Sequence, residues 1–174
     1  MRMALIVAPL ILALSGGALA QGSTYTVDDV VSHFKRKNLG APRSLCIGTP
    51  TECNMQREAQ QAPISPFNMQ VQFEFGSATL TFEAQRRLDV FAEAATGELR
   101  AERFDIDGHT DSVGPANANQ RLSEARAQSV VNYLVRRGVD PRRLRSTGYG
   151  ESSPKHPDGT NGANRRVEAS LADN

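Results

Sequence analysis

The run from Ile106 to Leu134 constrains the fold more than any other part of the chain. It passes from a strand-like alternation, through a short polar loop, into a long amphipathic helix. On a helical wheel, one side of that helix carries Leu122, Ala125, Ser129, Val130 and Tyr133. Arg126 and Asn119 lie inside the same stripe. Because burial of an unpaired guanidinium is costly, Arg126 requires an anion or an open groove.

Asp111 is the nearest candidate partner, since it directly follows the strand and the helix begins soon after it. The residues alone leave three roles open. Asp111 could form a structural salt bridge with Arg126 or cap the loop. The pair could also clamp a zwitterion, with Arg126 binding a carboxylate through two parallel bonds and Asp111 accepting from an ammonium. The positive end of the helix dipole would favour the same carboxylate.

The periodicity along residues 67–174 predicts the order β-α-β-α-β-β. Alternation of Met69, Val71, Phe73 and Phe75 indicates a first strand that Gly76-Ser77 ends. A helix is expected at 81–96 with Phe82, Leu88, Phe91, Ala92 and Ala95 on its core face, and further elements at 104–108, 116–137, 144–149 and 167–171. Strand-helix-strand units favour parallel pairing, with the last strand antiparallel. The predicted fold is an α+β two-layer sandwich, a mixed sheet with helices packed on one face.

Residues 1–20 have the pattern of a secretory signal peptide, with Arg2, an apolar run and Ala18-Leu19-Ala20 as cleavage site. The apolar run is too short for a spanning helix, which needs about 20 residues. Residues 21–66 are expected to form an N-terminal extension. It would hold a short helix capped by Thr26 and end in a linker over 54–66. The chain is therefore expected in the periplasm, peripheral to the outer membrane.

Cys46 and Cys53 are the two cysteines of the chain. In an oxidising compartment such a pair favours a disulfide. Free thiols or a redox pair are the alternatives, although a redox pair usually has two intervening residues. Labelling of thiols in periplasmic extract without reductant would exclude the disulfide.

Charge and motifs argue against several other functions. Removal of residues 1–20 takes away Arg2 and no acid, leaving 19 basic and 19 acidic residues, so no attraction to nucleic acid is expected. His109 has neighbours in Asp105, Asp107 and Asp111, but no histidine or cysteine ligand spacing accompanies it. We therefore expect a structural histidine, no metal and no cofactor. No nucleophile motif is visible either.

The region from Phe67 onward resembles the OmpA-like family, also described as the OmpA/Pal/MotB C-terminal domain. The motifs that carry the resemblance are Gly108-His-Thr-Asp111, Gly114, Asn119-x-x-Leu122-Ser123-x-x-Arg126-Ala127, Gly138, Gly148-x-Gly150 and Asn164-Arg-Arg-Val167. The resemblance implies an OmpA-like domain over residues 67–174 with the same β-α-β-α-β-β sandwich. It also implies non-covalent binding of peptidoglycan through the meso-diaminopimelate of the stem peptide.

The resemblance further implies a role for each matching residue. Asp111, in the Thr110-Asp111 step, takes the ammonium, and Arg126 takes the carboxylate. Asn119 and Arg165 are the next matching positions. Further contacts are expected from Val113, Gly76 and Ser77; Val113 would offer backbone groups only, and Gly76-Ser77 backbone or hydroxyl groups where many members carry Asp or Asn.

The leading expectation is a non-catalytic periplasmic protein that links the cell wall to the outer membrane or to an envelope partner. Residues 21–66 are the expected surface for that partner. One alternative is a wall hydrolase that uses Asp111, His109 and Asp107, which leaves Arg126 without a role. The other is a structural scaffold in which Asp111 and Arg126 only pair with each other.

Overall fold

A computed structural model describes residues 25–35, 65–74 and 76–172. The expected signal peptide over 1–20 and the expected disulfide between Cys46 and Cys53 lie outside these residues. Within them, no helix is long and apolar enough to cross a membrane.

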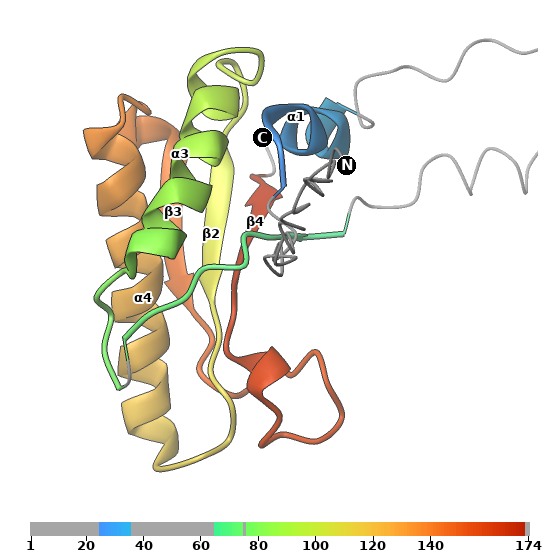
Figure 1. Ribbon diagram of the computed structural model, residues 1–174. Helices are drawn as coiled ribbons and strands as arrows, with labels where there is room; N and C mark the ends of the chain where they lie inside the picture. Colours follow the sequence, from blue (N-terminus) through green and yellow to red (C-terminus); the bar gives the residue numbers. More distant parts are fainter. Residues whose placement is uncertain (1–24, 36–64, 75, 173–174) are drawn as a thin grey trace, which may run out of the picture.

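Four strands form one mixed sheet in the order β1-β4-β2-β3. Their bounds are Phe67–Asn68 (β1), Phe104–Gly108 (β2), Leu144–Gly148 (β3) and Val167–Leu171 (β4). β2 and β3 are parallel, whereas β4 runs antiparallel to both β1 and β2. Helices α3 (Phe82–Thr96) and α4 (Ala116–Arg136) pack on one side of the sheet (Figure 1). The predicted α+β sandwich is confirmed, and the last strand inserts between the first two.

The first strand is shorter than the alternation predicted. β1 stops at Asn68, because Gln70 adopts a left-handed φ of +50° and its N–H donates to the Asn68 side chain. The following segment keeps one buried side, with Met69 and Val71 in the core. Phe73 makes only an isolated antiparallel bridge with Leu80. Burial therefore alternates as expected, but the regular backbone pairing of a strand does not continue past Asn68.

Helix α3 begins and ends where the sequence indicates. The Thr81 hydroxyl accepts from the Ala84 N–H as N-cap, and Gly97 follows the last turn. Leu88 and Phe91 are fully buried. Phe82 is 71% exposed, so its expected place on the core face is wrong. It is the first residue of the helix, and the Arg86 guanidinium lies over its ring.

Helix α4 lies unusually close to strands β2 and β3, because each strand carries a glycine there. A Cβ on Gly108 would lie 2.2 Å from the Ser123 carbonyl oxygen, and one on Gly148 would lie 2.4 Å from the Glu124 nitrogen. The face of α4 in contact with the sheet is therefore made of Ser123 and Ala127, both fully buried. The buried stripe is rotated from the predicted one, and it still includes Asn119 and Arg126.

The short helix expected in the extension is α1, Val27–Lys35. At its start the Asp29 side chain accepts from the Thr26 N–H at 2.8 Å, and the Thr26 hydroxyl accepts from the Asp29 N–H. Val30, Val31 and Phe34 are buried in the same core as the sheet and α3. The ring of Phe34 meets those of Phe91 and Phe104 edge-on. α1 is thus a packed element of the described structure.

Candidate functional site

Strand β2 delivers Thr110 and Asp111 to the end of the sheet where α4 begins. The Thr110 N–H donates to the Gly150 carbonyl, which holds the loop after β2 against the loop after β3. Both Thr110 and Asp111 are buried. One carboxylate oxygen of Asp111 accepts from the Val113 N–H at 3.3 Å, so the aspartate also shapes its own loop.

The ion-pair partner of Asp111 is Arg165. The two side chains meet at 2.6 Å between Nη1 and Oδ2, with Arg165 54% exposed and Asp111 only 12% exposed. No ion pair joins Asp111 to Arg126 in the described part of the chain, so the salt bridge considered from the sequence is replaced by this one. Asp111 is therefore paired with an arginine that lies far along the chain, just before β4.

Arg126 extends from α4 into the same region. Its Nε donates to the Ser77 carbonyl at 3.0 Å, and its guanidinium lies over the ring of Phe73, 5.0 Å from the centroid. Burial lowers the pKa of Arg126, the charge of Arg165 adds to this, and Asp111 opposes it. Within the described residues, Nη1 and Nη2 have no protein acceptor. Arg126 is therefore a buried cation with two free donor groups.

Asn119 joins the loop to the helix. Its Nδ2 donates to the carbonyls of Asp111 and Val113, at 3.2 and 3.3 Å, and to Glu151 Oε2 at 2.7 Å. Val113 is 62% exposed as a residue, and its backbone N–H and C=O both form hydrogen bonds. The buried position of Asn119 on α4 thus fixes the loop that carries Asp111.

The segment before α3 forms the other side of the site. Gly76 has a φ of +61°, and a Cβ added there would meet no atom within 4 Å, so this glycine turns the chain in open space. Ser77 contributes its carbonyl to Arg126, while its hydroxyl donates to Thr79. Gly76 and Ser77 therefore act through their backbone.

A polar loop between β3 and β4 places Arg165. Asn164 is fully buried, and its side chain accepts from the N–H groups of Lys155 and His156 and donates to the carbonyls of Asp158 and Gly159. The loop is also tied to the strand β2 side through the Ser112 N–H, which donates to the Gly159 carbonyl. This internal scaffold holds the next residue, Arg165, against Asp111.

A pocket of about 380 Å³ opens beside these side chains. It is lined by Val71, Gln72, Phe73, Thr81, Arg126, Gly162, Arg165 and Arg166. Three of these residues are arginines and none is acidic, while Asp111 stands at Arg165 on its border. The pocket therefore suits an anionic group with an ammonium at its edge.

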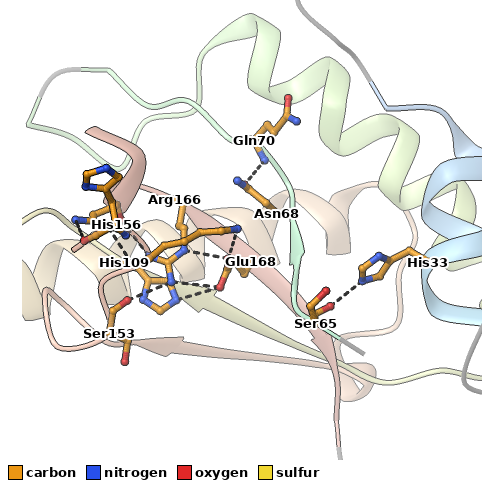
Figure 2. A network of polar contacts seen from close by, with 11 residues as sticks. His33, Ser65, Asn68, Gln70, His109, Ser153, His156, Arg166 and Glu168 are labelled. Carbon is orange, nitrogen blue, oxygen red and sulfur yellow. Dashed lines mark hydrogen bonds and ion pairs between the residues drawn. The ribbon is translucent and has the colours of Figure 1, made fainter. Parts of the chain in front are cut away.

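His109 belongs to a buried network on the helix-free side of the sheet, and Arg166 links this network to the pocket (Figure 2). Its ring stacks on Tyr149, and Nε2 lies 3.8 Å from Glu168, which Arg166 pairs with at 3.0 Å. Burial and the charge of Arg166 lower the pKa of His109 to about 4, although Glu168 opposes this. Burial raises the pKa of Asp107 to about 6, and the charges of Asp105 and Glu168 add to the effect. His109 is thus an uncharged structural residue at neutral pH.

The described residues contain no group of three or more His, Cys, Asp or Glu side chains that could hold a metal ion. His33 and His156, the other histidines, contact the Ser65 carbonyl and the Asp158 N–H respectively.

Sequence reasoning missed two contributors to the site. Phe73 supplies the aromatic face under Arg126, and Glu151 accepts from Asn119. Phe73 belongs to the predicted buried alternation, which is a usable signal for a neighbour of a buried arginine. Glu151 follows the Gly148-Tyr-Gly150 turn, and no local pattern links it to a residue 32 positions earlier.

Comparison with known proteins gives relatives of similar sequence. The chain is 36% identical over 132 residues to outer membrane protein A of Bordetella avium, covering 72% of the chain and 66% of the relative. It is 40% identical over 99 residues to a peptidoglycan-associated lipoprotein of Pseudomonas aeruginosa, covering 55% of the chain and 58% of the relative. The chain thus spans less than two thirds of either relative.

Solved structures agree with the fold. The peptidoglycan-associated lipoprotein of Burkholderia pseudomallei matches with a TM-score of 0.53 and 25% identity, over 59% of this chain and 88% of that one. The C-terminal domain of Helicobacter pylori MotB matches with a TM-score of 0.54 and 23% identity, over 64% and 86% of the two chains. The model of the OmpA family matches residues 72–168, more than half of the sequence. The chain therefore belongs to the OmpA family.

Proposed function

We propose that this protein is a non-catalytic envelope protein that binds peptidoglycan by clamping the diaminopimelate of the stem peptide. The observation that carries the proposal is Arg126, a buried guanidinium whose two Nη groups have no acceptor in the described part of the chain. Such a group binds a carboxylate through two parallel, charge-assisted hydrogen bonds. The free end of diaminopimelate offers that carboxylate and an ammonium beside it.

Asp111 receives the ammonium in this proposal. Its Oδ2 is held by Arg165, whose side chain is 54% exposed and free to turn away. When the ammonium takes the place of Arg165 at the carboxylate, the arginine is released toward the pocket that it lines with Arg126. There it can bind a second carboxylate or carbonyl of the stem peptide. Thr110, Asn119, Val113 and Ser77 hold the two charged groups in place through the contacts described above, and Gly76 provides the turn that leads into Ser77.

The relatives support the wall as the partner. Two of the proteins described above are named peptidoglycan-associated lipoproteins. The family match over residues 72–168 takes in Arg126, Arg165 and most of the other residues that line the pocket. We further propose a periplasmic location after export by residues 1–20. Residues 21–66 then serve as the surface for an outer-membrane or envelope partner.

The hydrolase alternative has weaker support. His109, with a pKa of about 4, stacks on Tyr149 and lies beside Glu168 in a network apart from Arg126. An uncharged, enclosed imidazole has no access to a substrate held at the pocket. Release of muropeptides from sacculi incubated with the protein would revive this alternative.

Co-sedimentation of the full chain with purified sacculi tests the proposal. Asp111→Ala and Arg126→Ala should each lose about 2–5 kcal/mol of binding, because each leaves an uncompensated charge. Arg121→Ala, which removes an exposed arginine from α4, is the control and should sediment as the wild type does. Free diaminopimelate should compete with the wild type. Undiminished sedimentation of both site variants, with their fold verified by thermal melting, would refute the clamp.

A further inference from the structure

A second pocket lies at the opposite end of the sheet, and the proposed wall binding makes no use of it. Its volume is about 360 Å³. It is lined by Arg103, Phe104, Asp105, Arg142, Arg143, Leu144, Arg145 and Ala172. β2 begins at this pocket and ends at the loop that carries Asp111. Five strand residues alone separate the two ends by about 16 Å.

Two of the four arginines are already engaged by the protein. Arg143 donates to the carbonyls of Ala95, Leu99 and Glu102, and so holds the end of α3 against the start of β3. Arg142 pairs with Asp140 at 2.7 Å. Their charges remain, but their donors are largely used.

The other two arginines are uncommitted. Arg103 and Arg145 are exposed, and neither side chain forms a hydrogen bond or ion pair among residues 25–35, 65–74 and 76–172. Phe104 is buried on the helix side, so the pleat directs Arg103 and Asp105 to the helix-free side of the sheet. Arg145 is the direct cross-strand partner of Asp105 and faces the same side. Two guanidinium forks therefore flank one aspartate.

Asp105 adds an acceptor. Its side chain lines the pocket, and its buried Oδ1 has no hydrogen-bond partner in the described structure. A ligand donor at the open side of this carboxylate would balance its charge. The pocket thus offers arginine donors for an anion and one acceptor for a donor beside that anion.

We propose that this arginine pocket binds a phosphate group that carries a neighbouring hydrogen-bond donor, as phosphoethanolamine does. The phosphate takes the forks of Arg103 and Arg145, which match its oxygens in pairs. The ammonium or hydroxyl of its substituent donates to the Asp105 carboxylate where it lines the pocket. A pocket of about 360 Å³ has room for such a headgroup. The ligand can be the headgroup of a lipid or a free phosphoester.

Thermal melting of the full chain with phosphoethanolamine tests the site, since a ligand of the folded state raises the midpoint. The wild type should show a rise, and the double variant Arg103→Ala/Arg145→Ala should bind at least about tenfold more weakly. Arg121→Ala, which removes one exposed arginine elsewhere, is the control and should respond as the wild type does. Arg126→Ala should also respond, so failure of the wall site leaves this result unaffected. An equal rise in the double variant, or no rise in the wild type, overturns the proposal.

Asp105→Asn tests the acceptor. The wild type should prefer phosphoethanolamine to inorganic phosphate, and the variant should lose that preference. An unchanged preference overturns the role of Asp105.

Vesicles then distinguish a lipid headgroup from a free phosphoester as the source of the ligand. Binding to phosphatidylethanolamine but not phosphatidylcholine vesicles, lost in the double variant, assigns the site to a lipid headgroup. A response to the soluble compound alone assigns it to a free phosphoester.

Discussion

At the scale of single residues, the site is defined by a carboxylate that already has a counter-charge. Asp111 is held by Arg165 at 2.6 Å, while Arg126 keeps its Nη groups free of any acceptor among the described residues. A ligand ammonium therefore exchanges one ion pair for another at Asp111, and the net gain there is small, although removal of Asp111 would still leave a bound ammonium without a partner. The larger gain comes at Arg126, where a buried cation acquires its first carboxylate. We infer that the carboxylate end of the ligand dominates affinity and the ammonium end adds selectivity.

Two neighbouring groups on the helix-free side give the stability opposing dependences on pH. His109 has a pKa of about 4, below the ordinary 6.5, so the unfolded chain binds its proton first and stability falls as pH drops from 6.5 toward 4. Asp107 has a pKa of about 6, above the ordinary 3.8, so the folded chain binds its proton first and stability rises as pH drops through 6. The two contributions partly cancel.

Replacing either group should reveal the pH dependence of stability that the other contributes. Between pH 6.5 and 4.5, Asp107→Asn should lose stability faster than the wild type on acidification, by about 1 kcal/mol after solvent screening is allowed for, because the histidine acts alone. His109→Gln should lose stability more slowly than the wild type. Urea unfolding midpoints measured across this range check both slopes. Parallel profiles for the wild type and both variants would contradict the assignment.

At the scale of elements, the contact between α4 and β2 depends on a missing side chain. Gly108→Ala would bring a Cβ to 2.2 Å from the Ser123 carbonyl oxygen, so α4 must move away from the strand. We expect a loss of about 3 kcal/mol of unfolding free energy, with weaker sacculus binding because Arg126 moves with the helix. Arg121→Ala, an exposed change on α4, is the control and should stay within about 0.5 kcal/mol of the wild type. An unchanged unfolding midpoint for Gly108→Ala would show that the helix is not held this closely.

The same elements show what local sequence can and cannot predict. Helix ends at Thr81 and Gly97, and the burial of Asn119 and Arg126, follow from capping and periodicity within a few residues. Contacts between distant segments leave no such pattern. Arg165 reaches Asp111 across 54 positions, and only the family resemblance indicated it.

Two predictions failed where hydrophobic periodicity was the only signal. Phe82 is exposed although it lies on the stripe that helical periodicity marks, and β1 ends early at the left-handed φ of Gln70. Periodicity predicts neither the exposure at the end of a helix nor the backbone pairing of a strand. The rotated stripe on α4 likewise follows from glycines on other elements.

At the scale of the whole molecule, α1 is part of the cooperative core. Phe34 is 1% exposed and touches Phe91 and Phe104, so Phe34→Ala should cost about 3 kcal/mol or more and shift a single unfolding transition. Ser32→Ala, an exposed change on the same helix, should stay within about 0.5 kcal/mol of the wild type. Calorimetry of the full chain gives both values. A normal midpoint for Phe34→Ala would mean that α1 docks without stabilising the sheet.

The order of the strands in the sheet also determines how readily copies of the protein can associate through strand edges. β4 and β2 occupy the centre, so only β1 and β3 present edges in the described sheet. β1 offers two residues before Gln70 turns the chain, and β3 carries the exposed charge of Arg145 next to a turn that begins at Pro141. Short or charged edges are poor templates for a further strand. The short β1 and the charged β3 therefore protect this mixed sheet against edge-to-edge aggregation.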